Sequence, residues 1–493
     1  WLDGGGGGAV CHAGGMLGIV SYGVYLPFWR LDRSEITSTL GQGGGRGTRA
    51  VAGYDEDSTS LGVEAGRLAL RSLAADVDAP HLLTFATTSP GYLDKTNATA
   101  VHAALRLDLS TPAFDSIGSA RSGIGAAWMA QAAGGMAVLA DVRTGRPGSA
   151  DEAAGGDGAA AFVFGADPIA VPVGSASSTA EFVDRWRVPG EAYSRQWEDR
   201  FGEHAYLPVA TEAITEALKS ADVAIADIDR VVVAGLHARA VGAVRRSIGV
   251  DAERLVDDFA MVVGNTATAH WGLMLAHALD TAEAGQRILV ANLADGCDVW
   301  ILQVTDAILA FRERAAAAGV QTVAARLGGP SGVVDYASFL TWRGMLDREP
   351  PRRPEPDRPA SPPSLRGTSW KYGFVGAQDD SGFVHLPPGR VSIGSGSIDE
   401  MTPVPMADRR AKIATFTIDR LAFSLAPPVV AAIVDFDHPD DPSGSTTLGR
   451  MQVELTDCDP DAVQIGDRVE MTFRRLYTVD GIHNYFWKAR PTN

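Results

Sequence analysis

The chain has 493 residues, of which 45% are hydrophobic and 21% charged, and this length predicts two or three domains rather than one core. A net charge of −17 argues against nucleic acid or an anionic membrane as a general partner, and no run of 18 apolar residues predicts a membrane span. Three widely spaced cysteines exclude a disulfide framework and a cysteine-rich zinc site, which fits a reducing cytoplasm.

Residues 1–15 are rich in glycine and lack the basic start and apolar stretch of a signal peptide. We interpret them as a disordered leader or a remnant of cloning, with Met16 as the natural start.

From Met16 onward, apolar segments alternate between strand and helix patterns. Strands are predicted at residues 17–25, 82–87 and 159–164, and helices at 57–73, 97–105 and 123–140. The last of these helices is rich in Ala, Gly and Met, which is typical of a helix packed tightly inside a protein.

A polar insertion at residues 180–206 is followed by a predicted helix at 210–220 and predicted strands at 230–236 and 287–293. Strands that alternate with helices predict a layered α/β architecture. Two similar halves, one on each side of the insertion, would suit a duplicated fold, but the sequence shows no strong internal repeat.

Residues 349–365 are rich in proline, which predicts an extended, semi-rigid linker that is neither helix nor central strand. Beyond the linker, apolar and polar residues alternate at 411–421, 429–436, 449–455 and 469–477. Four or five short strands in roughly 100 residues predict a small Greek-key barrel, most simply an OB-fold.

Three segments carry the functional signal. Residues 115–123 read as a buried strand that enters a small-residue turn and then a helix. Gly235-Leu236-His237 and Gly264-Asn265-Thr266 each close an apolar, strand-like run. This order is similar to that of thiolase-superfamily condensing enzymes, in which the turn carries a nucleophilic cysteine. The matching residue here is Ala120.

Further segments in the same order strengthen the resemblance. They are residues 22–27, 55–58, 63–65, 88–92, Lys95 with 98–99, 156–161, and 336–337 with 343–344. Residues 16–348 resemble the hydroxymethylglutaryl-CoA synthase branch of the thiolase superfamily, close to β-ketoacyl-ACP synthase III. The resemblance implies a five-layered αβαβα fold, a homodimer, and an acyl-CoA or acyl-carrier substrate.

In that family a cysteine thiolate attacks an acyl thioester, a histidine and an asparagine polarise a second carbonyl, and a glutamate deprotonates the donor carbon. The resemblance assigns the polarising pair to His237 and Asn265. It places Ala120 at the nucleophile position and Thr88 at the glutamate position. Two of the four catalytic groups are therefore missing.

Residues 366–493 resemble the zinc-ribbon/OB domain that accompanies acyl-CoA thiolases and synthases, through segments at 386–388, 473–475, 481–482, 485 and 488–491. That ribbon normally carries two Cys-x-x-Cys pairs. The matching positions here are Gln378, Ser381, Ser392 and Ser395, which offer no thiolate. We therefore expect no zinc and no other bound cofactor.

Arg121, Tyr92 and His270 are the predicted substrate-binding residues, and each has a structural alternative. Arg121 at a helix start is unfavourable for the helix dipole, which favours a contact with a CoA phosphate, or else an ion pair. Tyr92 acts as an acid or base in the pocket, or packs. His270 suits packing or support of the site better than the role of a replacement base.

The remaining candidates also have structural interpretations. His237 would serve as a packed core histidine, and Asn265 as a turn residue that tolerates the left-handed conformation. Ser119 and Ser122 flank Ala120 and are interpreted as small structural residues rather than substitute nucleophiles. Cys297 is interpreted in the same way, as a buried small residue.

Two functions of different class follow. The first is an enzyme that forms or cleaves a carbon–carbon bond in an acyl-CoA or carrier-bound acyl group without a cysteine intermediate, as in a retro-aldol cleavage. The second is a non-catalytic scaffold or intermediate-channelling subunit in a complex with a separate thiolase. The sequence does not decide between these two hypotheses for the isolated chain.

Overall fold

The computed structural model describes residues 17–349, 353–439, 441 and 446–492. The predicted leader at 1–15 lies outside the described residues, as do residues 350–352 of the linker. Within the described part, no helix is long and apolar enough to cross a membrane.

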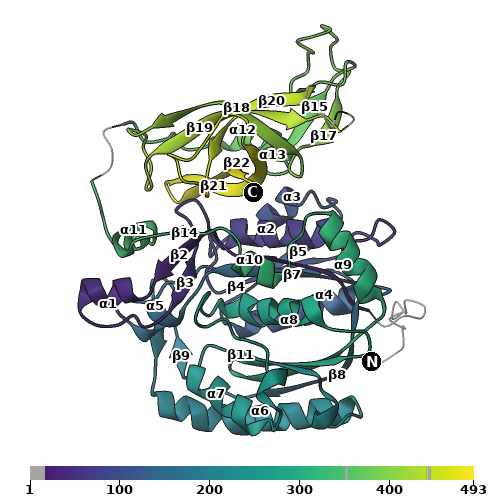
Figure 1. Cartoon of the computed structure of the whole chain (residues 1–493), viewed down its shortest axis with the longest axis vertical. Coiled ribbons are helices and arrows are strands. Elements are labelled where there is room, and N and C mark those ends of the chain that lie inside the picture. Colours follow the sequence, from purple (N-terminus) through teal and green to yellow (C-terminus); the bar gives the residue numbers. More distant parts are fainter. Residues whose placement is uncertain (1–16, 350–352, 440, 442–445, 493) are drawn as a thin grey trace, which may run out of the picture.

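Two stacked strand layers form the larger domain, and Figure 1 shows them between three layers of helices. The first layer has the strand order β5-β4-β6-β7-β1, and the second has the order β8-β13-β12-β11. A single pairing, Ile19 with Ala170, joins them into one nine-stranded sheet. The strands are β1 (Gly18–Tyr25), β4 (Leu83–Thr87), β5 (Ala113–Ile117), β6 (Met136–Asp141), β7 (Gly158–Gly165), β8 (Ala170–Thr179), β11 (Arg230–Gly235), β12 (Arg287–Leu293) and β13 (Gly296–Val304).

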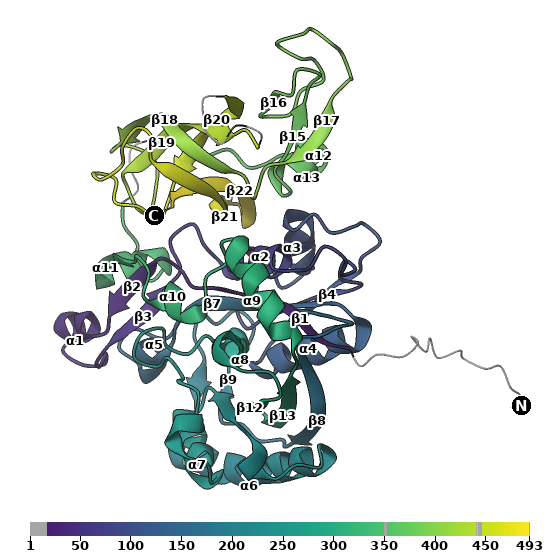
Figure 2. The same ribbon diagram turned by 45° about the vertical axis from the view of Figure 1, so that its right-hand side comes forward.

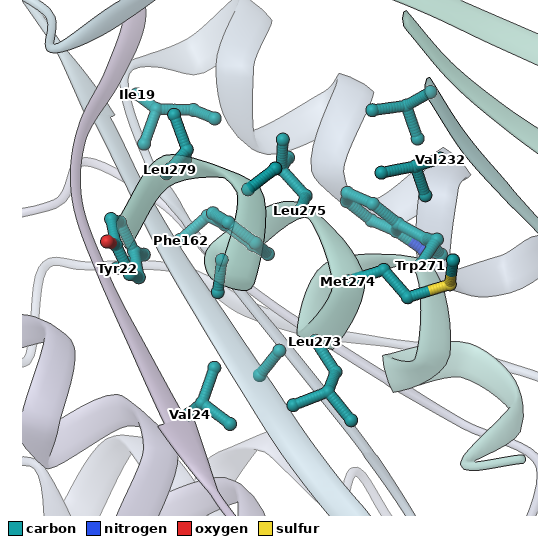
Figure 3. Close-up of a cluster of buried hydrophobic side chains, with 14 of the residues drawn as sticks. Ile19, Tyr22, Val24, Phe162, Val232, Trp271, Leu273, Met274, Leu275 and Leu279 are labelled. Atoms are coloured by element: carbon teal, nitrogen blue, oxygen red, sulfur yellow. The ribbon is translucent and has the colours of Figure 1, made fainter. Parts of the chain in front are cut away.

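The middle helix layer consists of α4 (Arg121–Ala133) and α8 (His270–Thr281). Helix α8 is apolar on nearly all sides because it packs between the two strand layers. Figure 3 shows Trp271, Leu275 and Leu279 of this helix among side chains of β1, β7 and β11, including Tyr22 and Phe162. The rings of Phe162 and Trp271 stack with their centroids 5.5 Å apart.

The outer helix layers are α2 (Ser58–Arg71) with α3 (Ala98–Ala104), and α6 (Asp199–Ser220) with α7 (Ala238–Ser247) (Figure 1). Helix α2 begins at a capping box, in which the Asp57 carboxylate accepts the Ser60 amide at 2.9 Å and the Ser60 hydroxyl binds the Asp57 amide. The predicted αβαβα order is present, with the two halves on either side of α4 and α8.

Smaller elements complete this domain at its side. They are β2 (Trp29–Asp32), α1 (Ser34–Leu40), β3 (Thr48–Val51), α5 (Ala150–Ala154), β9 (Arg185–Trp186), β10 (Arg195–Gln196), α9 (Ala307–Ala317), α10 (Val323–Leu327), β14 (Gly332–Val333), α11 (Tyr336–Trp342) and the 3₁₀ turns at Ile225–Asp227, Ala252–Arg254 and Ala267–Ala269. The predicted polar insertion therefore contains the β9–β10 hairpin and the start of α6.

Two element predictions in the middle of the chain were wrong. The helix expected at 123–140 ends at Gly134, which adopts the left-handed conformation with φ of 62° and is followed by β6. The apolar run before Gly264 is reduced to a bridge between Leu255 and Val231. The carboxylates of Asp257 and Asp258 bind backbone amides two residues ahead, and these turns compete with a strand.

Strand β5 was expected to be buried and lies instead at an edge of the sheet. Its side chains Phe114 and Ile117 are 59% and 39% exposed. The hydrophobic composition of the segment predicted the strand but not its place in the strand order.

The C-terminal domain is a closed barrel with the order β18-β19-β20-β22-β21, as expected for an OB-fold. Its strands are β18 (Arg410–Asp419), β19 (Val429–Asp437), β20 (Thr447–Leu455), β21 (Arg468–Val479) and β22 (Ile482–Pro491). A ribbon of three strands, β15 (Val375–Gln378), β16 (Val384–His385) and β17 (Thr402–Pro405), stands beside the barrel, most clearly in Figure 2.

The linker prediction needs one correction. The proline-rich segment ends in helix α12 (Ser361–Arg366), and α13 (Thr368–Lys371) follows directly. Pro362 and Pro363 fit α12 because they lie in its first turn, where the amide that proline lacks has no helical partner.

Three consecutive carboxylates of the larger domain, Asp55, Glu56 and Asp57, face cations and hydroxyls of the barrel. Arg474 pairs with Glu56 at 2.7 Å and with Asp55 at 3.4 Å. Lys488 pairs with Asp55 at 3.0 Å, and the Tyr485 hydroxyl donates to Asp57 at 2.7 Å.

This interface is buried. The side chains of Asp55, Arg474 and Lys488 are each at most 1% exposed, so the charges must stabilise one another in a medium that screens them weakly. Burial alone would raise the pKa of Asp55, but Lys488 and Arg474 lower it. Apolar residues of the barrel and of the α2 face also form one continuous cluster, so the two domains share a core.

We expect Arg474→Leu to lower the free energy of unfolding by about 3–5 kcal/mol, because it leaves buried carboxylates unpaired. Arg420→Leu is the matched control, since its pair with Asp461 is exposed on both sides, and it should cost at most about 1 kcal/mol. Urea unfolding of both variants checks this, and equal losses would contradict a stabilising role for the interface.

The pKa of Asp55 is lower in the folded chain than in the unfolded chain. Its contribution to the free energy of unfolding is therefore present at neutral pH and is lost as the pH falls below about 4.

Candidate functional site

The site predicted from the motifs forms around a small apolar cluster, here called the Ala120 cluster. Ala120, Ala267 and Ala294 are buried against one another, and Leu236 packs against them. These residues come from the start of α4, the turn before α8, the β12–β13 turn and the end of β11. The structure therefore brings the three segments with the functional signal together, with Ala120 at their meeting point.

A glycine allows this convergence. A Cβ atom on Gly123 would lie 2.4 Å from the carbonyl oxygen of Thr268, so any larger residue would push α4 away from the turn before α8. The small residues after Ala120 thus have a packing reason that is independent of any chemistry.

His237 caps the N-terminus of α7. Its Nδ1 accepts the Ala240 amide at 3.1 Å, which places the remaining proton of the neutral ring on Nε2. That Nε2 is buried and has no hydrogen-bond partner within the described structure. A buried donor without a partner costs free energy, and it suits a site that awaits an acceptor from a ligand.

Helix α6 covers this nitrogen. A Cβ atom on Gly202 would lie 2.2 Å from His237 Nε2, so the ring rests directly against the backbone of α6. The Tyr206 ring lies 6.0 Å from the His237 ring on the same helix face. A ligand oxygen can reach Nε2 only if the first turns of α6 move away.

Asn265 is held from both ends. Its Nδ2 donates to the Gly235 carbonyl at 2.8 Å, and its Oδ1 accepts the Ala267 amide at 2.9 Å. Its backbone pairs with the Gly155-Gly156 turn, where a Cβ atom on Gly156 would lie 2.0 Å from the Val263 carbonyl. The second Nδ2 hydrogen has no partner among the described residues and remains as a donor beside the strand end that leads into His237.

Thr88 belongs to a hydrogen-bond network around Asp141 rather than to the Ala120 cluster. Its amide and hydroxyl both donate to Asp141 Oδ1, at 2.6 and 2.8 Å. The other oxygen of Asp141 accepts the amide and hydroxyl of Thr268, at 2.9 and 2.6 Å. This fully buried carboxylate ties the loop after β4 to the turn that follows Asn265, so the position of the family glutamate has a structural use here.

The Arg121 guanidinium forms an ion pair within the chain. It contacts the Asp298 carboxylate twice, at 2.8 and 2.9 Å, and donates to the Asp295 carbonyl at 2.9 Å and to the hydroxyls of Ser177 and Thr179. This arrangement matches the ion-pair alternative, because it occupies the donors that a phosphate would need.

The other predicted substrate contacts have structural partners. Tyr92 packs against His483 of the barrel with ring centroids 4.7 Å apart, and its hydroxyl accepts the His483 amide at 2.8 Å. His270 is buried, and burial lowers its pKa to about 4, so it is neutral at pH 7. Cys297 is also buried, and burial raises the pKa of its thiol to about 12, which leaves it unreactive.

The structure adds Asp295 to the site. It follows Ala294 and has a φ of 47°, which is unusual for a residue other than glycine. Burial raises the pKa of its carboxyl, which a hydrogen bond from Ser119 partly offsets. Asp295, Asp141 and Gly202 were missed from the sequence because no local pattern marks them, although Asp295 stands in a segment noted for Cys297.

The predicted zinc-ligand positions of the ribbon surround a carboxylate. Asp379 accepts hydrogen bonds from Ser381 at 2.6 Å, from Ser392 at 2.8 Å and from His385 at 2.9 Å. These bonds hold the pKa of Asp379 below its usual range. The Ser395 amide donates to the Ser392 hydroxyl at 2.9 Å, and the Gln378 side chain donates to the Gly382 carbonyl at 2.8 Å. Hydroxyl and imidazole donors thus crosslink the hairpin where thiolates and a metal do so in zinc ribbons.

Two family models match the chain. Residues 218–302 match 3-oxoacyl-[acyl-carrier-protein (ACP)] synthase III C terminal, and residues 403–474 match ChsH2, C-terminal OB-fold domain. A hydroxymethylglutaryl-CoA synthase of Archaeoglobus fulgidus is 30% identical over 349 residues, which cover 67% of this chain and 99% of that protein. The chain belongs to the hydroxymethylglutaryl-CoA synthase family. The predicted resemblance is confirmed for both domains.

Solved structures agree on the fold. The hydroxymethylglutaryl-CoA synthase PksG of Bacillus subtilis superposes with a TM-score of 0.56 at 19% identity, covering 67% of this chain and 89% of PksG. The 3-oxoacyl-(acyl carrier protein) synthase III of Pseudomonas aeruginosa gives a TM-score of 0.52 at 19% identity, covering 59% and 98%. At these identities the superpositions support the fold of the larger domain and do not indicate a substrate.

We expect Asp379→Ala to loosen the ribbon, because three donors lose their common acceptor. Limited proteolysis should then cleave the ribbon faster than in the wild-type chain. The neighbouring Asp380 is exposed, so Asp380→Ala is the matched control and should leave the cleavage rate unchanged.

Elemental analysis of the purified chain should find less than one zinc per chain. A stoichiometric zinc would contradict the expectation that this network takes the place of the metal.

Proposed function

We propose that this family member acts on the thioester of an acyl-CoA or a carrier-bound acyl group, forming or cleaving a carbon–carbon bond without a covalent cysteine intermediate. The observation that carries the proposal is a pair of donors on the chain segments that contribute Leu236 and Ala267 to the Ala120 cluster. His237 keeps a buried Nε2–H without a partner, and Asn265 keeps its amide in a fixed orientation.

These donors suit the polarisation of a carbonyl. Two N–H groups aimed at one thioester oxygen stabilise the negative charge that develops when the adjacent carbon becomes an enolate. In the cleavage direction, a base takes the proton of a 3-hydroxyl group, the bond between the second and third carbons breaks, and the electrons move to the thioester oxygen. The released enolate then takes up a proton, which leaves a carbonyl compound and a shorter acyl thioester.

Asp295 is the base that the geometry favours. It follows Ala294 of the Ala120 cluster, and burial raises its pKa, which makes its carboxylate a better proton acceptor than an exposed one. Thr88 does not compete for the role, because Asp141 accepts its hydroxyl hydrogen. The N-terminal turns of α6 would act as the cover that leaves His237 when substrate enters.

His237→Ala should lower the kcat of the isolated chain for cleavage of 3-hydroxyacyl-CoA thioesters by about 10²–10³-fold, because one of two oxyanion donors is lost. Chromatography of the released acyl-CoA measures the rate. His204 lies on the exposed side of α6, so His204→Ala is the control and should keep full activity. Turnover unchanged in His237→Ala would contradict the assignment.

The second candidate is a non-catalytic scaffold or channelling subunit that works with a separate cysteine-bearing thiolase. It is favoured by Ala120 and by the structural use of Thr88. The same His237 variant distinguishes the candidates. A scaffold has no turnover alone, and a complex of this chain with a thiolase would keep its activity after His237→Ala.

We also propose a homodimer through the free edge of β5. The edge presents unpaired backbone groups together with the exposed Phe114 and Ile117, and such an edge favours pairing with a second copy.

Phe114→Lys should convert the dimer to a monomer, because it places a charge at the centre of that edge. Light scattering coupled to gel filtration measures the mass. Leu109→Lys is the control, since Leu109 is 97% exposed and precedes the strand. A wild-type monomer, or a dimer that survives Phe114→Lys, would contradict the proposal.

A further inference from the structure

A cavity of about 540 Å³ lies between the two domains, and no residue of the Ala120 cluster lines it. Its walls come from the end of β1, from α2, from residues 319–330 and from β18, β21 and β22 of the barrel. None of Ala120, His237 and Asn265 lines it. The volume lies in the range of small-molecule sites.

Seven arginines line this cavity, although the chain as a whole is acidic. Arg67, Arg71, Arg468 and Arg490 form ion pairs with carboxylates of the chain. Arg30, Arg326 and Arg410 form none within the described part of the chain. Arg30 donates only to the carbonyls of Pro27 and Trp29.

Arg326 is the most informative of the three. Its Nε is buried without a partner, and burial together with the nearby charge of Arg490 lowers its pKa to about 10. The group is still protonated at pH 7. Arg326 is partly exposed and forms no ion pair within the described residues, since the nearby Glu470 and Glu64 pair with other arginines. The like charge of Arg490 beside it is unfavourable. An anion in the cavity would act as a counter-ion to Arg326 and offset this repulsion.

The carboxylates of the cavity do not supply that counter-ion. Glu470 pairs with Arg490 at 2.7 Å, Glu64 with Arg67 at 2.7 Å, and Asp457 with Arg474. Asp459 and Asp467 accept backbone amides of their own loops, at 3.0 and 2.8 Å. Three guanidinium groups are therefore left for a ligand.

We propose that this inter-domain cavity binds the phosphate groups of a nucleotide-sized ligand, with Arg326 and Arg410 as the phosphate contacts. Guanidinium groups match phosphate oxygens in both charge and geometry. Phe28 and Pro330 add apolar wall surface on which a base can rest. Arg410 comes from the barrel and Arg326 from the larger domain, so a bound phosphate would bridge the two domains. This cavity is separate from the site of the proposed function, because none of Ala120, His237 and Asn265 lines it.

Isothermal titration of the full chain with adenosine 3′,5′-bisphosphate tests the proposal. We expect saturable binding that Arg326→Gln and Arg410→Gln each weaken roughly tenfold or more, the loss typical of a charge-assisted hydrogen bond. Arg410 is exposed, so Arg410→Gln keeps the test valid if Arg326→Gln does not fold. Arg420→Gln, on the barrel surface outside the cavity, should bind as the wild type does.

Coenzyme A and inorganic phosphate, titrated in parallel, distinguish the sources of the phosphate. Tighter binding of either adenine-bearing compound than of inorganic phosphate supports the assignment to a nucleotide. Equal affinity for inorganic phosphate would overturn that assignment, and the absence of saturable binding would overturn the site. Binding that survives both arginine variants but is lost in His237→Ala would also overturn the proposed cavity site, because the ligand would then bind beside His237.

Discussion

The fused architecture depends on one buried cluster of charges, in which Asp55, Glu56 and Asp57 of the larger domain face Arg474 and Lys488 of the barrel. Each partner alone would be costly to bury, so the cluster is stable only when both domains are docked in this register. Asp57 at the same time caps α2, the helix that covers the first strand layer. The barrel is therefore part of the structure that supports the larger domain rather than a tethered module.

Buried carboxylates with several partners also hold the segments around the candidate site. Asp141 binds Thr88 and Thr268, and Asp157 binds the Ala52 and Arg143 amides and pairs with Arg49 and Arg343. Asp141 thereby fixes the loop after β4 and the turn that follows Asn265, regardless of whether a nucleophile is present. The family fold is thus kept around Ala120, and in the proposed function the donors of His237 and Asn265 act on a carbonyl without a cysteine thioester.

Much of this could be predicted from the sequence, since apolar periodicity indicated β1, α2, β4, β7, β12 and the barrel strands. The failures have local physical causes. Gly134 ends a helix whose composition would have allowed it to continue, the turns at Asp257 and Asp258 replace a strand, and prolines that exclude a helix interior begin α12. Motif order singled out Ala120, His237 and Asn265 as candidates, but the partners of Asp55 lie some 400 residues away in the chain and leave no local pattern. The same holds for Gly202, whose role appears only when α6 packs against His237.

In the proposed function, His237 and Asn265 polarise a thioester carbonyl beside Ala120. A crystal structure with a non-reactive acyl-CoA analogue tests this role most directly. We expect the carbonyl oxygen at about 2.7–3.1 Å from both His237 Nε2 and Asn265 Nδ2, with the first turns of α6 displaced from the ring. An analogue whose carbonyl lies elsewhere, with His237 still packed against Gly202, would contradict it.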